Sequence, residues 1–458
     1  MKAGVLDRST PPEPGPVRTF DFPAVGRERM GADDGPDLFL ARHGDLPLVT
    51  VQVLVEGGAE GERPEQAGLA HLTSEALEAG TARHDVEALA WELESLGVEL
   101  DTGSSWDAAS VGMTVAIERL EPAVELLAEV VRTPAFPADQ VDRLRDQQLA
   151  TILQRQKEPR ALANQAAARF IFRDGVPYGR PLLGVRETVT SLGPEDLRRF
   201  HDVRYRAGSA AVIVVGAIDP DRAADVMRSR FGDWRGEAAP AATFDVAPRI
   251  EATTVFIVDR PGSVQSEIRL GHVGVDRGHG DYFPLQVMNT ILGGAFTSRL
   301  NMNLRERHGF TYGARSGFAF RRRPGPFSVD VAVATDVTVR ALEEAFREIR
   351  SLREEGPTDA ELDNARDYLR GVLPLQLQTT DQLASRIAEI KVYGLPDDYF
   401  AGYRERIAAV TREDVLRVAR ESVRPDAMAV VIVGDAAQIE KPIRGLELGE
   451  VQVVDAVP

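Results

Sequence analysis

The chain has 458 residues, and its 43% hydrophobic and 27% charged content is typical of a globular protein with about two to four packed units. The formal net charge of −17 argues against a nucleic-acid-binding surface, because phosphates would meet a repulsive field. The same acidity favours basic peptides as ligands, although an acidic surface also serves solubility alone. No cysteine is present, so thiolate metal sites, disulfides and cysteine nucleophiles are excluded.

No segment has the length of a membrane helix. The longest apolar runs, Ala210–Ile218 and Met428–Val433, are too short to cross a bilayer and predict buried strands. The first thirty residues are rich in proline and scattered charge, and they lack the apolar core of a signal peptide. We therefore expect no membrane association and a cytoplasmic location.

The elements predicted along the chain form two similar series. The first series has strands at 37–41 and 48–55, helices at 67–79 and 85–97, a strand hairpin at 98–117, and helices at 121–132 and from 133 past 152. The second has strands at 253–258 and 265–272, helices at 282–292 and 298–309, a hairpin at 310–334, and helices at 338–353 and from 356 past 373. Each series closes on a buried strand that ends in glycine, Ala211–Gly216 and Ala429–Gly434.

A repeat of this length predicts duplicated domains instead of a solenoid. We expect an α+β fold with two homologous domains, each an antiparallel sheet packed with helices. The domains are placed at residues 36–234 and 251–440, and an Ala- and Pro-rich linker joins them at 235–250. Residues 1–35 and 441–458 show no sustained apolar period and are predicted to be tails.

The helix predicted at 67–79 lies in the sequence GLAHLTSEALEAGT, residues 68–81. By itself this stretch is typical of an amphipathic core helix closed by a glycine. Its two ends resemble the zinc helix of the pitrilysin or inverzincin peptidases, whose H-x-x-E-H motif carries two zinc-binding histidines and a glutamate base. Laid on that motif, His71 keeps the first ligand, whereas Ser74 stands at the base and Glu75 at the second histidine.

The resemblance implies a third zinc ligand, a glutamate about seventy-six residues after the second histidine. That count from Glu75 reaches Ala150 and Thr151, neither of which binds zinc. His71 and Glu75 are still one helical turn apart, with Glu78 close by, so a rewired metal site remains an alternative. We expect no metal and no cofactor in this chain, and His71 as a hydrogen-bonded, partly buried histidine.

A second stretch, LRERHGFTY at residues 304–312, resembles the family's second-domain signature, in which an arginine and a tyrosine seven residues later reach the scissile peptide. By this resemblance the pair is Arg305 and Tyr312. Arg305 falls in the last turn of a predicted helix, Gly309 permits a sharp exit, and Tyr312 is predicted to start the next strand. The two groups can donate to a substrate carbonyl and to the oxyanion of a tetrahedral intermediate. Taken singly, Arg305 is better explained as a helix-terminal cation and Tyr312 as an ordinary strand aromatic. The functional interpretation is favoured for the two together, at the family's spacing and in the matching position of the repeat.

Two weaker candidates concern substrate binding. Gly293 and Gly294 mark a helix break, and by resemblance a mobile loop that faces the substrate. The stretch Gly103–Asp107 precedes a predicted strand and contains Trp106. It is either a sheet edge to which an extended peptide adds a strand, or a hairpin turn with Trp106 packed on the core.

The resemblance implies half of a clamshell-shaped peptidase. The leading hypothesis is the non-catalytic subunit of a heterodimeric, processing-peptidase-like zinc metalloendopeptidase. In it, a homologous partner subunit holds the zinc, and this chain contributes Arg305 and Tyr312 to peptide hydrolysis while being inactive alone. The alternative is a catalytically dead scaffold or peptide-binding subunit with no part in hydrolysis. An independent hydrolase that uses His71 and Glu75 would hold about one zinc per chain.

Overall fold

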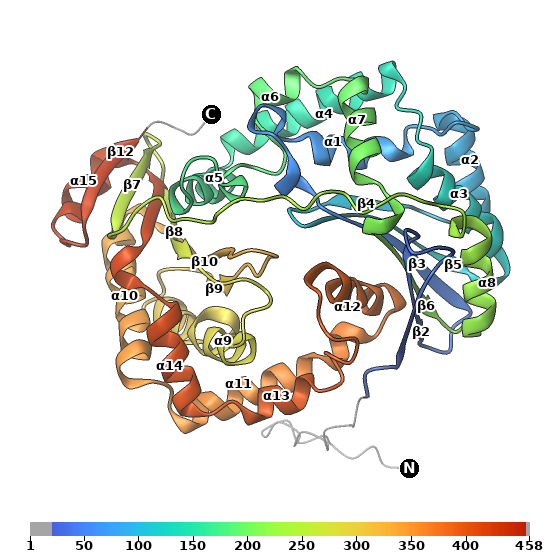
Figure 1. Ribbon diagram of the computed structural model, residues 1–458. Helices are drawn as coiled ribbons and strands as arrows, with labels where there is room; N and C mark the ends of the chain where they lie inside the picture. The colour runs from blue at the N-terminus through green and yellow to red at the C-terminus, as the bar shows by residue number, and fades with distance from the viewer. Residues whose placement is uncertain (1–20, 455–458) are drawn as a thin grey trace, which may run out of the picture.

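The computed structural model describes residues 21–454, which form two domains that follow the internal repeat (Figure 1). The strands of the first domain are β1 Val25–Arg29, β2 Asp37–Arg42, β3 Leu48–Glu56, β4 Asp101–Ser104, β5 Ala108–Ala116 and β6 Ala210–Gly216. Its helices are α1 Leu69–Glu75, α2 Val86–Leu96, α3 Leu120–Arg132, α4 Ala138–Lys157, α5 Pro159–Ile171, α6 Arg186–Thr190, α7 Pro194–Arg204 and α8 Pro220–Phe231.

The second domain repeats this order of elements. Its strands are β7 Thr254–Asp259, β8 Gln265–Val273, β9 Ala314–Phe318, β10 Pro326–Ala334, β11 Ala429–Gly434 and β12 Glu450–Val454. Its helices are α9 Tyr282–Asn289, α10 Thr338–Glu355, α11 Asp359–Val372, α12 Thr380–Tyr393, α13 Tyr403–Ala409, α14 Arg412–Ser422 and α15 Ala436–Arg444. Within residues 21–454, no helix combines the length and apolar character that a bilayer crossing requires.

Each domain is built on a six-stranded sheet, in the order β1-β2-β6-β3-β5-β4 in the first and β12-β7-β11-β8-β10-β9 in the second. The predicted α+β class and two-domain organisation are confirmed, but the sheets are mixed and not purely antiparallel. Strands β2 and β6 pair in parallel, as do β7 and β11. In both domains the parallel pair is joined through the intervening helices, and such a long connection is what parallel pairing needs.

The outermost strands β1 and β12 lie in segments that were predicted to be tails. Strand β1 pairs antiparallel with β2, and β12 pairs in parallel with β7, so this prediction is wrong for Val25–Arg29 and Glu450–Val454. Helix α15 also extends the second domain past residue 440. These strands escaped detection because edge strands alternate weakly between apolar and polar residues, as the sequence VGRER of β1 shows. The predicted tail residues 1–20 and 455–458 lie outside the described part.

The central strands are apolar on both faces because each face belongs to a different core. In β6, Val212 and Val214 face the core of the first domain, whereas Ile213 and Val215 face the core that contains most of the second domain. In β11 the alternation is reversed, with Val431 in the first core and Ile432 in the second. The two closing strands predicted from the sequence therefore carry side chains into both hydrophobic cores.

Each sheet is covered by a helix from the other domain. Helix α5 of the first domain packs on β8 and β11, and helix α12 of the second packs on β3 and β6 (Figure 1). Phe170 of α5 stacks on Phe256 of β7 with ring centroids 3.9 Å apart. This exchange of helices fixes the two domains to one another through buried apolar surface.

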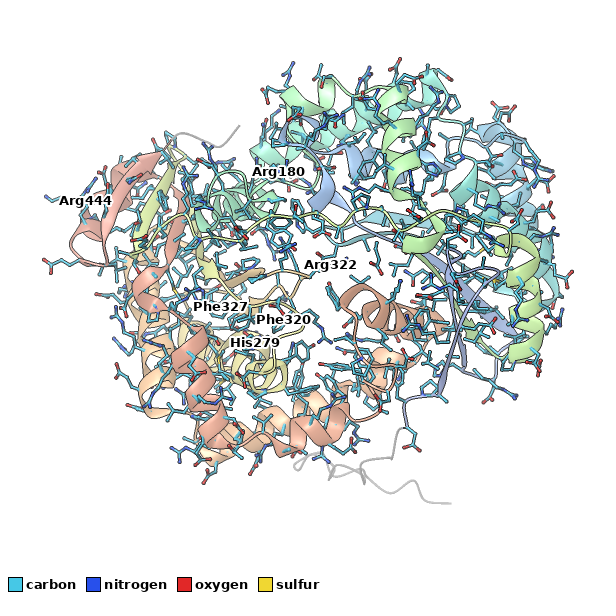
Figure 2. All side chains as sticks on the ribbon, in the orientation of Figure 1. Arg180, His279, Phe320, Arg322, Phe327 and Arg444 are labelled. Carbon is cyan, nitrogen blue, oxygen red and sulfur yellow. The ribbon has the colours of Figure 1, made fainter. Side chains whose placement is uncertain are left out.

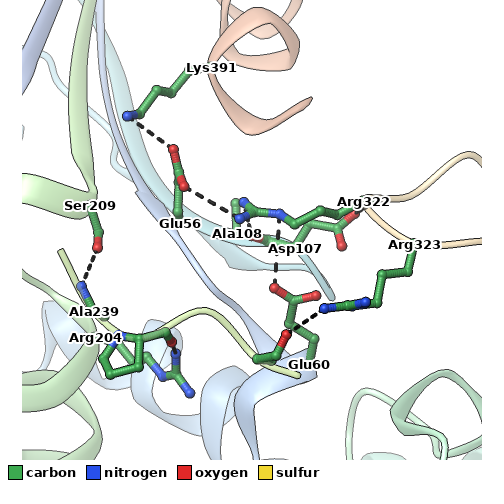
Figure 3. Close-up of polar contacts among 12 residues, drawn as sticks. Glu56, Glu60, Asp107, Ala108, Arg204, Ser209, Ala239, Arg322, Arg323 and Lys391 are labelled. Carbon is green, nitrogen blue, oxygen red and sulfur yellow. Dashed lines mark hydrogen bonds and ion pairs between the residues drawn. The ribbon is translucent and has the colours of Figure 1, made fainter. Parts of the chain in front are cut away.

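A polar network adds to the domain contact at the tip of the β9–β10 hairpin (Figure 3). Buried Asp107 accepts hydrogen bonds from the hydroxyls of Tyr178 and Tyr393, at 3.2 and 3.3 Å, and from the backbone N–H of Arg322 at 3.2 Å. The Arg322 guanidinium reaches Glu56 at 3.4 Å, and Lys391 of α12 lies 3.0 Å from the same carboxylate. Asp107 thus joins groups from both domains around one buried carboxylate.

We expect Asp107→Ala to lower the free energy of unfolding by about 2–4 kcal/mol, because the buried hydroxyl of Tyr178, the half-buried hydroxyl of Tyr393 and a backbone N–H lose their acceptor. Denaturant titration measures this effect. Asp101→Ala, at an exposed position in the β4–β5 hairpin that also contains Asp107, is the control and should change stability by less than about 0.5 kcal/mol. Equal losses in the two variants would contradict the role given to Asp107.

The neighbouring Glu60 makes this interface sensitive to pH. Burial raises the pKa of its carboxyl from 4.5 to about 7, with Asp107 acting in the same direction and Arg322 opposing both. The folded chain therefore holds this proton more tightly than the unfolded chain, so Glu60 lowers the free energy of unfolding as pH rises from 4.5 to about 7.

We expect Glu60→Gln to become progressively more stable than the wild type over that pH range. Thermal or denaturant unfolding at a series of pH values measures the difference between the two proteins. Glu65→Gln, an exposed position in the same loop, should give a difference that does not vary with pH. A flat difference for Glu60→Gln as well would refute the assignment.

Candidate functional site

The start of helix α1 is held by groups that have no part in metal chemistry. The carboxylate of Glu62 accepts hydrogen bonds from the backbone N–H groups of Gly68, at 3.2 Å, and Ala70, at 2.6 Å. Gly68 has φ +96, and a β-carbon there would lie 2.6 Å from the carbonyl oxygen of Leu183. Only glycine fits this position, so the glycine that opens the Gly-Leu-Ala-His stretch is a requirement of the fold.

The three motif positions of α1 face different surroundings. The Ser74 side chain is buried, and its hydroxyl donates to the backbone carbonyl of His71 at 2.8 Å, so it does not face the site. Glu75 is exposed. His71 is half-buried, and burial lowers its pKa, with Arg155 acting in the same direction and Glu75 opposing. The predicted partial burial of His71 is confirmed, and the predicted hydrogen bond of its ring stays a prediction.

Helix α4 packs against α1, but Ala150 and Thr151 are exposed and do not mark the face that α1 contacts. Buried Gln148 lies on that face, and its amide donates to the carbonyl oxygens of Gly68, at 3.2 Å, and Leu183, at 2.8 Å. Arg155 lies two turns further along and approaches His71. Counting about seventy-six residues from Glu75 did not lead to Gln148 or Arg155. The helical spacing of the residues on this face could have revealed it, namely Val141, Gln148, Ile152 and Arg155.

Residues 21–454 contain no group of three or more histidine, aspartate or glutamate side chains arranged to hold a metal ion. Amide and guanidinium groups stand where α4 meets α1. A guanidinium carries only donors and repels a cation, so this set of residues does not suit zinc.

An acidic surface lies beside edge strand β4. A cavity of about 550 Å³ between β4, β5 and α12 has the carboxylates of Glu99, Asp101 and Asp381 in its lining. Glu78, in the short 3-10 helix Ala76–Glu78 that follows α1, accepts a hydrogen bond from Thr102 at 3.2 Å. Burial raises the pKa of Glu78, and Glu75, Glu99 and Asp101 add to this rise, which shows that these carboxylates lie close together. A second cavity of about 360 Å³ continues along β4 and shares Asp101 with the first.

Arg305 and Tyr312 lie on one segment of the second domain. Arg305 belongs to a π-helical segment, η8 Asn301–Arg307, and its guanidinium lies 4.4 Å from the ring centroid of Phe296. Gly309 has φ +64 and turns the chain out of this segment, as expected. Tyr312 does not start the strand, since β9 begins at Ala314, and its side chain is 97% exposed. Within residues 21–454, no hydrogen bond or ion pair joins either side chain to α1.

The weaker candidates have structural roles. Trp106 is buried at the contact between the domains, where its ring meets Tyr178 edge to face and lies 5.2 Å from the guanidinium of Arg321. Strand β4, which ends just before it, is a sheet edge as expected. Gly293 lies in the segment η7 Thr290–Gly294, and a β-carbon there would lie 2.4 Å from the backbone nitrogen of Ser316. Close packing against β9 thus explains Gly293, while substrate binding by it and by Gly294 stays a prediction.

Family models match both halves of the chain. Residues 40–184 match the model described as insulinase, peptidase family M16, and residues 191–369 match the peptidase M16 inactive domain. The chain belongs to peptidase family M16. This is the family that the helix at 68–81 and the stretch at 304–312 resemble, so that prediction is confirmed. The chain is an M16 member without the zinc motif.

Relatives of known sequence or structure support this membership. An uncharacterized zinc protease of Mycobacterium tuberculosis is 29% identical over 382 residues, which cover 82% of this chain and 86% of the relative. A non-peptidase homolog of Helicobacter pylori is 22% identical, covering 77% of this chain and 81% of its own. A solved peptidase M16 inactive domain from Pseudomonas fluorescens is 26% identical with a TM-score of 0.83, covering 90% of this chain and 98% of that chain.

We expect the purified chain to hold well under one equivalent of zinc, because its M16 helix retains one ligand and α4 supplies none. Elemental analysis after dialysis against zinc-containing buffer measures the content. A His71→Ala variant is the matched control and should give the same low value. About one zinc per chain, lost in His71→Ala, would show that His71 and Glu75 form a rewired site.

Proposed function

We propose that this chain is the non-catalytic subunit of a heterodimeric, processing-peptidase-like M16 endopeptidase, in which a homologous partner subunit holds the zinc. The observation that carries the proposal is the contrast between the two signature segments. The base and second-ligand positions of α1 hold a buried serine and an exposed glutamate, whereas Arg305 and Tyr312 are retained and face outward. In this proposal the chain does not hydrolyse peptides at a zinc site of its own.

The setting of Arg305 suits a contact with a second molecule. Its side chain is 34% exposed, stacks on Phe296, and has Glu306 as its ion-pair partner at 3.6 Å. Phe296 is itself 63% exposed, so an apolar ring and a guanidinium lie together at the surface. A guanidinium supported on an aromatic ring keeps its planar set of donors available to a carbonyl or an oxyanion.

Tyr312 is the second element of this surface. A phenol that is 97% exposed buries almost no area against its own chain, so its presence adds little to the stability of the monomer. Tyrosine is frequent at interfaces because its ring and hydroxyl both find partners there. In the proposed pair it donates to the substrate peptide bound at the partner's zinc.

Strand β4 and the acidic cavities support binding of an extended peptide. An edge strand offers unpaired backbone groups to which a peptide adds as a further strand, and this mode needs an unfolded ligand. The carboxylates of Glu99, Asp101 and Asp381 favour lysine or arginine side chains in that ligand. We therefore propose that unfolded peptides with basic residues are the substrates of the pair.

The test uses the pair isolated from native cells through a tag on this chain. We expect Arg305→Ala and Tyr312→Phe each to lower kcat/KM for a peptide substrate by about 10²-fold or more, since each removes a donor to the reacting carbonyl. The effect on kcat should exceed the effect on KM, because the interaction is strongest in the transition state.

Matched controls are Arg307→Ala, in the same helical segment, and Tyr368→Phe, an exposed tyrosine of α11. Both should leave activity within about twofold of the wild type. Activity that is equally unaffected in Arg305→Ala and Tyr312→Phe would favour the alternative, a scaffold or peptide-binding subunit with no part in hydrolysis. Hydrolysis by this chain alone that a chelator abolishes would refute both readings.

A further inference from the structure

A further pocket lies between the domains. It is lined by basic side chains, whereas the β4 cavities are lined by acidic ones. It has a volume of about 500 Å³ and lies among α4, α5, the segment 178–184 and the β9–β10 hairpin. Ile152, Leu183 and Trp106 give it an apolar part. Four arginines also line it, Arg155, Arg160, Arg180 and Arg321, against one carboxylate, Glu158. The chain as a whole has a net charge of −17, so the positive charge of this pocket is opposite in sign to that of the chain.

None of the four guanidiniums has an ion-pair partner within the described residues. Glu158 accepts a hydrogen bond from Gln154 at 3.0 Å and does not pair with any of them. Elsewhere in residues 21–454 a half-buried arginine can have a carboxylate partner, as Arg299 has in Glu361 at 2.7 Å. Acidic residues are abundant in this protein, so the lack of a partner here leaves these cations available to a ligand.

The two deeper arginines are held in fixed positions. The Arg321 guanidinium lies 4.4 Å from the ring centroid of Tyr178 and 5.2 Å from that of Trp106, and its side chain donates no hydrogen bond to the described residues. Arg180 donates from Nη2 to the carbonyl oxygen of Glu62 at 3.2 Å, while its Nε and Nη1 have no acceptor. Figure 2 shows Arg180 on the first domain, on the side that faces the β9–β10 loop and Arg322.

The nearby carboxylates do not compensate these charges. Burial lowers the pKa of Arg180 even though Glu62 and Glu65 oppose it, and burial lowers the pKa of Arg321 even though Tyr178 and Asp107 oppose it. The oxygens of Asp107 are already bonded to Tyr178, Tyr393 and Arg322. A half-buried cation without an acceptor is stabilised when an anion enters beside it.

We propose that this pocket binds a carboxylate of a peptide ligand, with Arg155 and Arg160 at the exposed mouth and Arg180 and Arg321 inside. A planar guanidinium fork matches a carboxylate, and aromatic rings behind the fork hold it in place. The apolar part of the pocket accepts the carbon atoms that bear the carboxylate. Trp106, which follows edge strand β4 by two residues, joins the pocket to the strand on which a peptide would lie.

This proposal rests on the peptide-binding part of the proposed function and needs neither the partner subunit nor hydrolysis. The carboxylate has two possible sources, a glutamate or aspartate side chain and the free C-terminus of the peptide. Both present the same anion to the same donors, so the experiment must separate them.

The test measures binding of a short, fluorescently labelled peptide to the purified full-length chain by anisotropy. The peptide is made in three forms: with one glutamate and an amidated C-terminus, with a free C-terminus and glutamine in place of glutamate, and with neither carboxylate. We expect one of the first two forms to bind about tenfold or more tightly than the third, and that form identifies the source. The preference should decline as salt is added, because the mouth is exposed.

Two variants assign the effect to the pocket. Arg155→Gln changes an exposed side chain without a partner, so it keeps the fold, and it should weaken the preferred peptide about tenfold while leaving the neutral form unchanged. Arg321→Lys keeps the charge but loses the planar fork, and it should weaken the same peptide severalfold. Arg143→Gln, on the exposed side of α4, is the matched control and should bind as the wild type does.

Three results would overturn the proposal. They are equal binding of the three peptide forms, wild-type affinity in both Arg155→Gln and Arg321→Lys, and no detectable binding of any form up to about 1 mM peptide. Failure of the proposed role in hydrolysis is a separate result, because it appears only as unchanged kcat/KM in the Arg305 and Tyr312 variants of the pair.

Discussion

The burial of both faces of each sheet is the constraint on which the structure depends. Strands β6 and β11 place alternate side chains in two cores. One face of each sheet is covered by a helix from the other domain, α12 over β3 and β6 and α5 over β8 and β11. A sheet with an uncovered apolar face would expose a large hydrophobic surface. The two domains are therefore held as one unit, and the surfaces between them, including the β4 cavities and the arginine pocket, have fixed walls built from both halves of the chain.

The packing around helix α1 explains how an M16 chain without the zinc motif keeps its fold. Gly68 is required by its left-handed backbone and by the close carbonyl of Leu183, and Glu62 satisfies the backbone N–H groups at the start of α1. These interactions do not involve zinc. The serine at position 74 is buried, and its hydroxyl donates to the backbone carbonyl of His71. The residues that flank the motif are thus needed for packing and helix capping, whereas the motif residues are needed for metal chemistry. Substitution can therefore remove the metal site without removing the fold.

Sequence reasoning succeeded where the signal is local. Strand β11 spans Ala429–Gly434, as its apolar run predicts, and α2 begins after Asp85, whose side chain accepts from the N–H of Ala88, as an N-cap should. It failed where the cause is tertiary. Parallel pairing of β2 with β6 depends on the path of the chain, and the face of α4 that meets α1 depends on how two helices cross. Arg321 and Arg180 lie 141 positions apart in the sequence, and only the interface between the domains brings them to one pocket.

The two charged pockets lie toward opposite ends of strand β4, and this arrangement constrains how a peptide can bind. Asp101, at the start of β4, lines the acidic cavity, while Trp106, just beyond its end, lines the arginine pocket. A peptide that pairs in parallel with β4 has its C-terminus near Trp106, and one that pairs antiparallel has it near Asp101. A free C-terminal carboxylate reaches the arginines only in the parallel arrangement, whereas an acidic side chain reaches them in either. The source of the carboxylate therefore also reports the direction of the bound strand.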